Sequence, residues 1–400
     1  MELLAPAGTL EKGKTAIAFG ANALYLAGQQ FGLRARAGNF SEEDMAEMVA
    51  YAHERGVKVY VTANIIPHNR DLVGVHEYFQ RLGEFGIDAL IVADPGILAL
   101  AREILPEVEM HLSTQASMTN WRSARFWYEQ GVKRIILARE LSAEEIGEIK
   151  AQVPEIDLEV FVHGAMCVSY SGRCLLSAYM AGRDANLGDC AQPCRWKYHL
   201  MEEKRPGEYF PIEESEEGTF IFNSRDLCLI GQIPDLARLG VTSLKIEGRM
   251  KSVHYVATVV GAYRRAIDGY YSNPAEWQVD PDWLAELDKV SHRPYTTGFF
   301  TGRPGAEAQD YGGSNVGQAD FVGMVTNVGA DVMEVDVRNR IEAGEHLELL
   351  VPQQQGRPYV LEWMRDCETR ESVSQAHPNW RVQMPNPGQV TPYSILRRKK

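Results

Sequence analysis

Short apolar segments alternate with longer amphipathic segments from the start of the chain, and this alternation limits the fold more than any other feature. The apolar segments predict strands at Glu2–Ala5, Ala23–Ala27, Lys58–Asn64, Ala89–Asp94, Met110–Gln115, Arg134–Arg139, Asp157–His163 and Ser243–Glu247. Between them the chain predicts helices, which begin after capping residues such as Ser41 and end at glycines such as Gly86. Eight such strand–helix units favour a (βα)8 barrel. An open doubly wound sheet shows the same alternation, but this chain lacks its early glycine fingerprint.

The periodicity changes after residues 302–317, which are rich in Gly, Pro and Ala. Beyond them, alternation in FVGMV, DVMEVDV, HLELLV, YVLEWM and WRVQM predicts a small all-β domain. We therefore expect an α/β chain with a TIM-type (βα)8 barrel domain over residues 1–300, a linker over 301–317 and a C-terminal β-barrel domain over 318–400. A cysteine-bearing insertion at about 164–223 follows the seventh strand. Within it, Trp196–Asn223 is typical of a hairpin. The seventh helix is expected after the insertion, at about Asp226–Leu239.

Composition and charge narrow the class of protein. A hydrophobic content of 45% and a charged content of 24% are ordinary for a soluble globular protein, and no apolar run approaches the roughly 20 residues that span a membrane. The opening MELLAPAG lacks the pattern of a secretory signal, so we expect a cytoplasmic protein. A net charge of −13 argues against broad nucleic-acid binding but leaves room for local basic patches. Candidates are Arg34 with Arg36, Arg264 with Arg265, and Arg397–Lys400, each of which can instead be solvated surface charge.

Four of the six cysteines lie in one stretch, at Cys167, Cys174, Cys190 and Cys194. Disulfides do not suit the expected compartment, and structural zinc favours paired ligands two residues apart, which this stretch lacks. An iron–sulfur cluster accepts looser spacing, so we expect these four thiolates to hold a [4Fe–4S] cluster. Zinc and four unligated buried thiols remain alternatives. Cys228 and Cys367 stand alone and are expected to be packing residues.

A phosphate-binding pattern near the N-terminus has a simpler interpretation. Gly8, Gly13, Lys14 and Thr15 match the P-loop spacing after a strand. A helix that starts at Thr9 and runs to Phe19 has a better length, and it makes Gly13 and Lys14 ordinary mid-helix residues. We therefore do not expect a nucleotide site here.

Polar residues gather where the expected strands end. They are Asn64, Asp94, Gln115, Arg139 with Glu140, His163, and Glu247 with Arg249. Because the carboxyl ends of barrel strands meet on one face, we expect these side chains to line an active site. Asp94 precedes Pro95 and is better interpreted as a helix start. His163 is either a proton-transfer group or a hydrogen-bonded core histidine.

Several motifs resemble one protein family. Glu159-x-Phe161-x-x-Gly164-Ala165-Met166-Cys167, followed by Gly172-x-Cys174-x-Leu176-Ser177, is similar to the signature of the peptidase U32 (collagenase-like) family. ELLAPAGTLE, SLKIEGRMKS and SHRPYTTGF also resemble that family, over about three-quarters of the chain. Order and spacing look closest to its tRNA-hydroxylation branch, which makes 5-hydroxyuridine at the wobble position using prephenate. Between Cys194 and the NSRDL segment the chain looks shorter than longer members of that branch.

The resemblance assigns roles to the candidate residues. It implies tRNA as the partner and prephenate as the co-substrate, with the cluster on the four cysteines. Prephenate carries two carboxylates, and the forked guanidinium of arginine matches a carboxylate bidentately. We therefore expect Arg34, Arg36, Arg139 and Arg249 to bind it, although each of them can instead pair with Glu140 or Glu247. Asn64 and Gln115 are further substrate-binding candidates, and His163 and Glu247 are catalytic candidates.

Two other functions stay open. The family name implies a peptidase, but the sequence shows no zinc-protease helix motif and no nucleophile elbow. A peptidase that used Cys167 would also compete with cluster ligation. A non-catalytic RNA-binding or cluster-carrying scaffold would bind tRNA without any dependence on prephenate. The sequence also leaves open a partner subunit of the same family.

Overall fold

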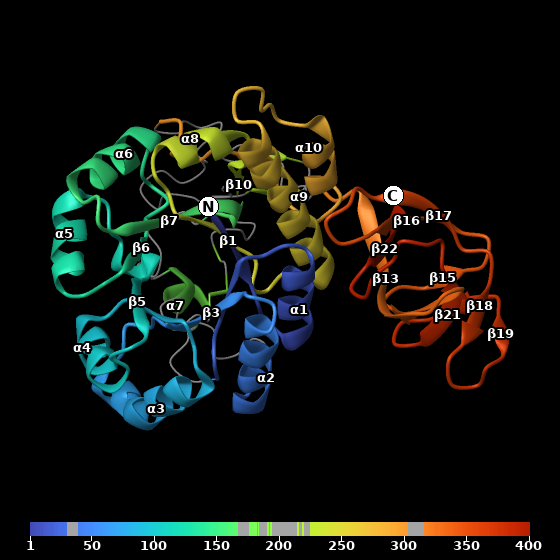
Figure 1. Cartoon of the computed structure of the whole chain (residues 1–400), viewed down its shortest axis with the longest axis horizontal. Helices are drawn as coiled ribbons and strands as arrows, with labels where there is room; N and C mark the ends of the chain where they lie inside the picture. The colour runs from blue at the N-terminus through green and yellow to red at the C-terminus, as the bar shows by residue number, and fades with distance from the viewer. Residues whose placement is uncertain are drawn as a thin grey trace, which may run out of the picture. The chain divides into compact units, whose positions relative to one another are not determined.

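The computed structural model describes residues 1–29, 39–166, 225–302 and 316–400, with short pieces at 176–181, 183, 190–191, 193, 214–215 and 218–219 (Figure 1). The chain divides into two compact units. The first comprises Met1–Gly13, Asn22–Met250 and Arg293–Asn315. The second comprises Lys14–Ala21, Lys251–His292 and Val316–Lys400.

The first unit is a closed barrel of eight parallel strands, as predicted. The strands are β1 (Glu2–Pro6), β2 (Ala23–Leu26), β3 (Lys58–Ala63), β4 (Ala89–Val92), β5 (Glu109–Leu112), β6 (Arg134–Ile136), β7 (Asp157–Ala165) and β11 (Ser243–Ile246). Each strand pairs in parallel with its sequence neighbour, and β11 pairs with both β1 and β7, which closes the barrel. Long apolar side chains such as Leu4, Leu24 and Val61 are fully buried, as strands covered on both faces require.

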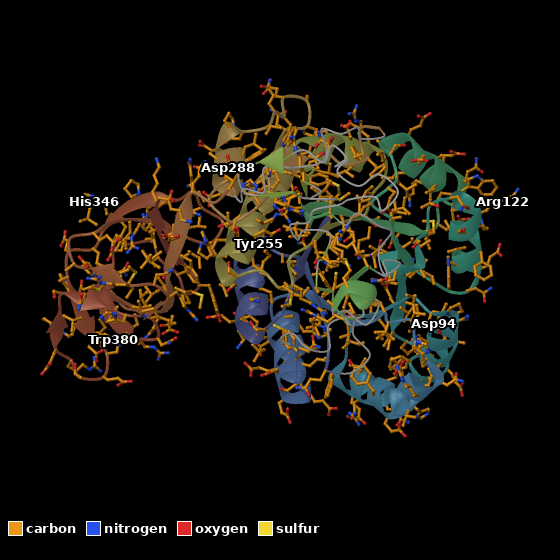
Figure 2. All side chains as sticks on the ribbon, turned by 180° about the vertical axis from the view of Figure 1, so that it is seen from behind. Asp94, Arg122, Tyr255, Asp288, His346 and Trp380 are labelled. Atoms are coloured by element: carbon orange, nitrogen blue, oxygen red, sulfur yellow. The ribbon has the colours of Figure 1, made fainter. Side chains whose placement is uncertain are left out.

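Helices surround the barrel strands (Figure 1). They are α2 (Glu42–His53), α3 (Val75–Phe85), α4 (Pro95–Ile104), α5 (Trp121–Glu129), α6 (Ala143–Gln152) and α8 (Ile233–Arg238), with η1 (Asn69–Leu72), η2 (Thr114–Ala116) and η5 (Ile230–Gln232) between elements. The expected caps are present: Ser41 accepts from the amide of Asp44 at 3.1 Å, and Gly86 ends α3 in the left-handed region with φ 75°. Asp94, labelled in Figure 2, caps α4 by accepting from the amides of Gly96 and Ile97 at 2.8 and 3.0 Å. Asp94 is therefore a helix start, as interpreted.

The segment Asp226–Leu239 differs from the single helix that we predicted. Asp226–Cys228 forms strand β10, which pairs antiparallel with the end of β7, and β12 (Tyr295–Thr296) pairs in parallel with β10. The Asp226 carboxylate accepts from Arg293 Nε at 3.0 Å, and both residues are buried. These long-range contacts override the local helical pattern, so the helix α8 begins only at Ile233, with Pro234 in its first turn.

The predicted hairpin at Trp196–Asn223 lies mostly outside the described residues. Within it, β8 (Glu214–Ser215) and β9 (Gly218–Thr219) form a short antiparallel pair. The helix α7 (Leu176–Ala181) is the other described element of the insertion.

An ionic layer lies inside the barrel below its carboxyl ends. Arg134 Nη1 contacts Glu2 Oε1 at 2.6 Å and Glu159 Oε2 at 3.4 Å, and Lys245 Nζ contacts Glu159 Oε1 at 2.8 Å. Because β1 and β6 are not neighbours, the Glu2–Arg134 contact crosses the barrel. Burial opposes ionisation of Glu2, but attraction by Arg134 and hydrogen bonds, one of them from Tyr60, outweigh it and lower its pKa. Two carboxylates and two cations therefore neutralise one another in the interior.

The second unit contains an antiparallel all-β domain, as predicted. One sheet runs in the order β17 (Arg357–Val360), β16 (His346–Leu350), β22 (Ile395–Lys399), β13 (Ala319–Val328), β14 (Val332–Val337), β21 (Arg381–Pro385), β18 (Met364–Asp366) and β19 (Ser372–Val373). A smaller pair joins β15 (Ile341–Glu342) to β20 (Gln375–Ala376). The same unit holds α9 (Val253–Ser272), α10 (Pro281–Leu287) and the end of α1 (Leu10–Ala18), a helix that contains Gly13 and Lys14 as interpreted.

The basic tail Arg397–Lys400 is a correction to the sequence interpretation. We considered it as a nucleic-acid patch or as solvated charge, but most of it belongs to β22 and Arg397 is fully buried. Arg397 contacts Glu286 on α10 through Nη1 at 2.6 Å and Nη2 at 2.8 Å, and Glu348 through Nε at 2.7 Å. The sequence RRKK alone indicates only positive charge. It gives no sign that Arg397 is buried, because the residues that Arg397 contacts are distant along the chain.

Candidate active site

The carboxyl ends of the barrel strands bring most of the predicted site residues onto one face. Asn64 follows β3, Gln115 lies in η2 after β5, and Arg139 follows β6. His163 lies in β7, and Glu247 and Arg249 follow β11. Arg34 and Arg36, together with Cys167, Cys174 and Cys194, lie outside the described residues.

Arg139 is held by three groups on this face. Its Nη1 donates to the carbonyl of Ala165 at 2.7 Å, its Nη2 lies 3.9 Å from Glu247 Oε2, and its guanidinium carbon lies 3.9 Å from the centre of the Phe161 ring. Its Nε is buried with no hydrogen-bond partner among the described residues. The alternative pairing with Glu247 is therefore present, and one donor of Arg139 remains uncommitted.

Glu247 is held by Tyr25 of β2, the next strand but one from β11 in the barrel. The Tyr25 hydroxyl lies 3.3 Å from Glu247 Oε2 and 3.0 Å from the carbonyl of Ile246. β2 and β11 are separated by β1, so these contacts span one intervening strand. Glu247 thus lies between a phenol and a guanidinium, which fixes its carboxylate in one orientation.

Arg249 is buried, with 6% of its surface exposed, and it reaches across the barrel to β3. Its Nη1 lies 3.5 Å from Thr62 Oγ1. Its backbone passes so close to the loop after β1 that a Cβ on Gly8 would lie 2.3 Å from the Arg249 carbonyl oxygen. This close approach by itself requires a glycine at position 8.

Asn64, Ser113 and Gln115 form a polar cluster on the same face. Asn64 Nδ2 donates to Ser113 Oγ at 2.9 Å, and the backbone amide of Gln115 lies 3.3 Å from the same oxygen. Asn64 and Gln115 each have 9% of their surface exposed. Asn64 Oδ1 and Gln115 Oε1 have no hydrogen-bond partner in the described part of the chain.

His163 is almost fully buried and lies beside Tyr295. Its Nε2 is 3.5 Å from the Tyr295 hydroxyl, and the two ring centres are 5.2 Å apart. Sequence reasoning missed Tyr25, Thr62, Ser113 and Tyr295 as site residues. Tyr25 and Thr62 lie within strands and matched a packing pattern, and only their contacts to Glu247 and Arg249 identify them.

The cysteine segment begins at the end of β7, on the same face of the barrel. Cys167 follows the buried Met166 directly, and β7 ends at Ala165. Ser177 in α7 is fully buried, and its Oγ accepts from the amide of Ala191 at 2.8 Å. Ser177 lies three residues after Cys174, and Ala191 directly follows Cys190, so this bond draws the segments that carry those two cysteines together. This arrangement fits a shared ligand site. The described residues alone contain no group of three or more His, Cys, Asp or Glu that could hold a metal.

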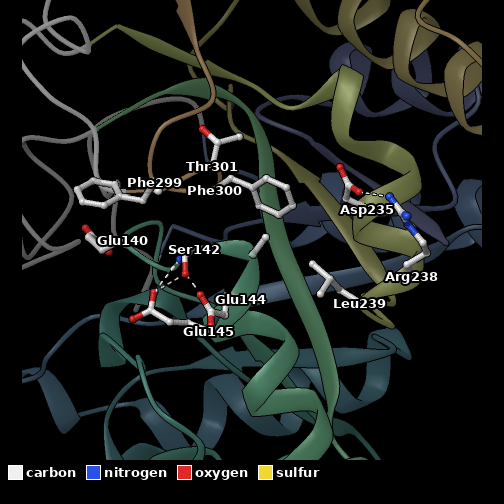
Figure 3. Close-up of a pocket in the computed structure, with 12 residues that line it drawn as sticks. Glu140, Ser142, Glu144, Glu145, Asp235, Arg238, Leu239, Phe299, Phe300 and Thr301 are labelled. Carbon is white, nitrogen blue, oxygen red and sulfur yellow. Dashed lines mark hydrogen bonds and ion pairs between the residues drawn. The ribbon is translucent and has the colours of Figure 1, made fainter.

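An open groove of about 1110 Å³ lies beside the β6–α6 loop (Figure 3). Ser142 and Glu145 cap α6 within it, Asp235 pairs with Arg238 on α8, and Phe299 and Phe300 line the remaining wall. The residues that line it are Glu140, Ser142, Ala143, Glu144, Glu145, Asp235, Arg238, Leu239 and Phe299–Gly302. Burial raises the pKa of Glu140 despite the nearby charge of Arg139. Because carboxylates dominate, this groove suits RNA phosphates poorly.

A (βα)8 barrel whose carboxyl-end face gathers buried arginines, amides and a fixed carboxylate is the architecture of a barrel enzyme. This chain belongs to the peptidase U32 family. Residues 8–310 match the model of peptidase family U32, and residues 318–397 match the model of the peptidase family U32 C-terminal domain. Among the described residues, no helix has the length and apolar character to cross a membrane.

Curated relatives cover nearly the whole chain. tRNA hydroxylation protein P1 of Bacillus subtilis (strain 168) is 43% identical over 100% of this chain and 95% of its own length. tRNA hydroxylation protein P of Escherichia coli (strain K12) is 40% identical over 88% of this chain and 86% of its own length. The 23S rRNA 5-hydroxycytidine C2501 synthase of E. coli is 34% identical over 88% of this chain, which corresponds to 52% of that longer protein.

Proposed function

We propose that this protein is a tRNA hydroxylase that converts the wobble uridine to 5-hydroxyuridine, with prephenate as co-substrate and a [4Fe–4S] cluster as cofactor. Full-length similarity to tRNA hydroxylation protein P1 carries the tRNA-hydroxylating part of the proposal, because that alignment spans both units of the chain. The barrel face supports an enzyme, since its polar groups come from strands far apart in the sequence and meet at the carboxyl ends.

The two described arginines support a dicarboxylate co-substrate. Arg139 and Arg249 reach the barrel face from β6 and β11, and both are largely buried. A guanidinium in a poorly hydrated site binds a carboxylate strongly, because little water competes for its donors. Glu247 stands beside Arg139 at 3.9 Å, so a bound carboxylate would share Arg139 with Glu247. Arg34 and Arg36, outside the described residues, complete the proposed clamp.

Cys167, Cys174, Cys190 and Cys194 would hold the cluster. The Ser177–Ala191 hydrogen bond supports this, because it draws the chain around Cys174 and Cys190 together after the strand that precedes Cys167. When bound, such a cluster supplies an electron-transfer or Lewis-acid centre. Arg139 donates to the carbonyl of Ala165, two residues before Cys167, and so fixes the start of the cysteine segment.

His163 and Glu247 take the positioning and proton-handling roles. Glu247 accepts a hydrogen bond from the Tyr25 hydroxyl and forms an ion pair with Arg139, so it orients the groups that face the co-substrate. The His163 Nε2 and Tyr295 hydroxyl pair can hold a proton between the β7 strand and β12. Tyr295 also places an aromatic ring beside His163, which restricts the ring's rotation.

Mass spectrometry of tRNA nucleosides from a strain that lacks the gene tests the proposal. We expect 5-hydroxyuridine derivatives to disappear in the deletion strain and to return with the wild-type gene. Complementation with Arg249→Ala should fail, whereas complementation with Cys367→Ser should succeed, because Cys367 lies in the C-terminal sheet domain and outside the proposed ligand set. Unchanged 5-hydroxyuridine levels in the deletion strain would refute the proposed activity.

A further inference from the structure

The loop after β5 carries a buried polar side chain whose oxygen accepts no hydrogen bond from the described residues. Gln115 is 91% buried, since 9% of its surface is exposed, yet its Oε1 has no hydrogen-bond partner within the described residues. A buried carboxamide without partners costs free energy that an apolar side chain of similar size would not. The backbone amide of Gln115 donates to Ser113 Oγ. This bond holds the backbone of the loop, but it does not involve the Gln115 carboxamide.

Ser117, two residues further along the same loop, is a second and independent observation. Its backbone lies in the left-handed region with φ 52°, which is unfavourable for a residue that is not glycine. Its Oγ is buried and also lacks a hydrogen-bond partner in the described part of the chain. Backbone strain and uncommitted polar groups in one loop are typical of a segment shaped for a ligand.

Asn64 is a third residue on this face with a buried polar atom that has no partner in the part of the chain that the structure describes. Its Nδ2 is fixed by Ser113 Oγ at 2.9 Å, and its Oδ1 is buried without a partner in the described residues. Gln115 and Asn64 therefore both lie beside Ser113, and each carries a buried carboxamide oxygen that has no partner among the described residues. All three side chains are neutral, in contrast to Arg139 after β6 and Arg249 after β11.

We propose that Gln115, assisted by Asn64, binds the Watson–Crick edge of the pyrimidine that the enzyme modifies. This inference rests on the proposed function. A carboxamide offers one donor and one acceptor side by side, and the N3–H and O4 of uracil present the complementary pair. A base that enters a buried site is read by hydrogen bonds along this edge. The 5-position of uracil lies next to C4 and outside the N3–H and O4 pair, so this contact would leave it uncovered.

This subsite has neutral side chains, whereas the proposed co-substrate site has positively charged ones. Prephenate is a dianion, and its carboxylates gain most from the guanidinium groups of Arg139 and Arg249. A neutral amide pair gives a carboxylate only single donors and leaves its own acceptors unused. Uracil is neutral and uses both halves of a carboxamide, so its N3–H would satisfy the Gln115 Oε1 that has no partner among the described residues.

The variants Gln115→Leu and Gln115→Glu test the inference in the full-length, anaerobically purified protein. Gln130→Leu is the matched control, because Gln130 is exposed at the end of α5. We measure the melting temperature without ligand, its increase with prephenate, and kcat/KM for hydroxylation of tRNA. Gln115→Leu should lower kcat/KM by about 10- to 100-fold, as the loss of a bidentate base contact does. Gln115→Glu keeps the acceptor and loses the donor, so it should fall between Gln115→Leu and the wild type.

Stability and co-substrate binding provide the contrast. Because Gln115→Leu removes a buried unpaired amide, its melting temperature without ligand should be unchanged or higher, and the prephenate-induced increase should match the wild type. A lost prephenate response would instead assign Gln115 to the co-substrate. A kcat/KM equal to that of Gln130→Leu would remove any role in binding the base. Wild-type protein that hydroxylates no tRNA would overturn the proposed function, and this inference with it.

Discussion

Arg397 should be a main stabilising residue of the second unit, although it lies in a basic tail. Its side chain is fully buried, with two hydrogen bonds to Glu286 and one to Glu348. Arg397→Met removes the charge and keeps much of the volume. It leaves the Glu286 carboxylate buried with Lys289, 2.9 Å away, as its remaining ionic partner among the described residues.

The expected loss follows from the geometry of this network. Breaking one partner out of a buried ion pair costs about 3–5 kcal/mol, because the other charge stays buried. Lys289 and proton uptake by Glu286 offset part of that cost, so we expect the lower end, about 3 kcal/mol. Such a loss corresponds to roughly 150-fold faster amide exchange wherever exchange requires the sheet to open.

Hydrogen exchange with mass spectrometry measures this change in the unit concerned. Peptides from β13, β14 and β16 should exchange faster in Arg397→Met, whereas peptides from the barrel strands should be unaffected. Lys399→Met is the control, because Lys399 lies in the same strand and is exposed. An acceleration below about tenfold, or one equal to that of Lys399→Met, would show that Arg397 does not stabilise the sheet through Glu286 and Glu348.

Three further outcomes are expected. Burial of His254, and next the charge of Arg397, lower the pKa of this side chain to about 3. The unfolded chain therefore gains a proton near pH 6.5 that the folded chain does not, and the free energy of unfolding should fall by up to about 1.4 kcal/mol per pH unit as the pH drops below 6.5. His254→Phe should flatten that slope in pH-dependent unfolding. Ser177→Ala, which removes the bond to Ala191, should release iron to a chelator about tenfold faster than the wild type, whereas Cys228→Ser should not. Arg249→Ala should weaken prephenate binding by about 10- to 100-fold in calorimetry, and Arg249→Lys should restore only part of it; equal affinity in all three proteins would exclude Arg249 from the clamp.

The barrel could be predicted from sequence because its signal is local and repeated. Each strand is a short apolar segment, and several strands follow a glycine at the end of a helix, as β3 and β4 follow Gly56 and Gly86, so the eight strands were placed to within a few residues. Asp226–Cys228 was predicted wrongly as helix because its strand conformation depends on β7 and on Arg293, both distant in sequence. The buried position of Arg397 was not predicted for the same reason, because its partners Glu286 and Glu348 lie 111 and 49 residues away along the chain.

The site could be predicted only where chemistry coincides with a strand end. Asn64, Gln115 and Arg249 stood out as polar residues after apolar segments, and the structure brings them to one face. Thr62 and Tyr25 were missed because a hydroxyl within a strand does not interrupt the apolar pattern. The lack of a hydrogen-bond partner for Gln115 Oε1 among the described residues could not be predicted at all, because it depends on which groups surround the side chain after folding.

Reconstitution in vitro is the most direct measurement. Anaerobically purified protein is incubated with tRNA from the deletion strain, with and without prephenate, and the tRNA nucleosides are analysed by mass spectrometry. We expect a uridine one oxygen atom heavier at the wobble position only when prephenate is present, and none with Cys167→Ser or Cys174→Ser protein. Hydroxylation that proceeds equally well without prephenate, or with the cysteine variants, would contradict the proposed chemistry.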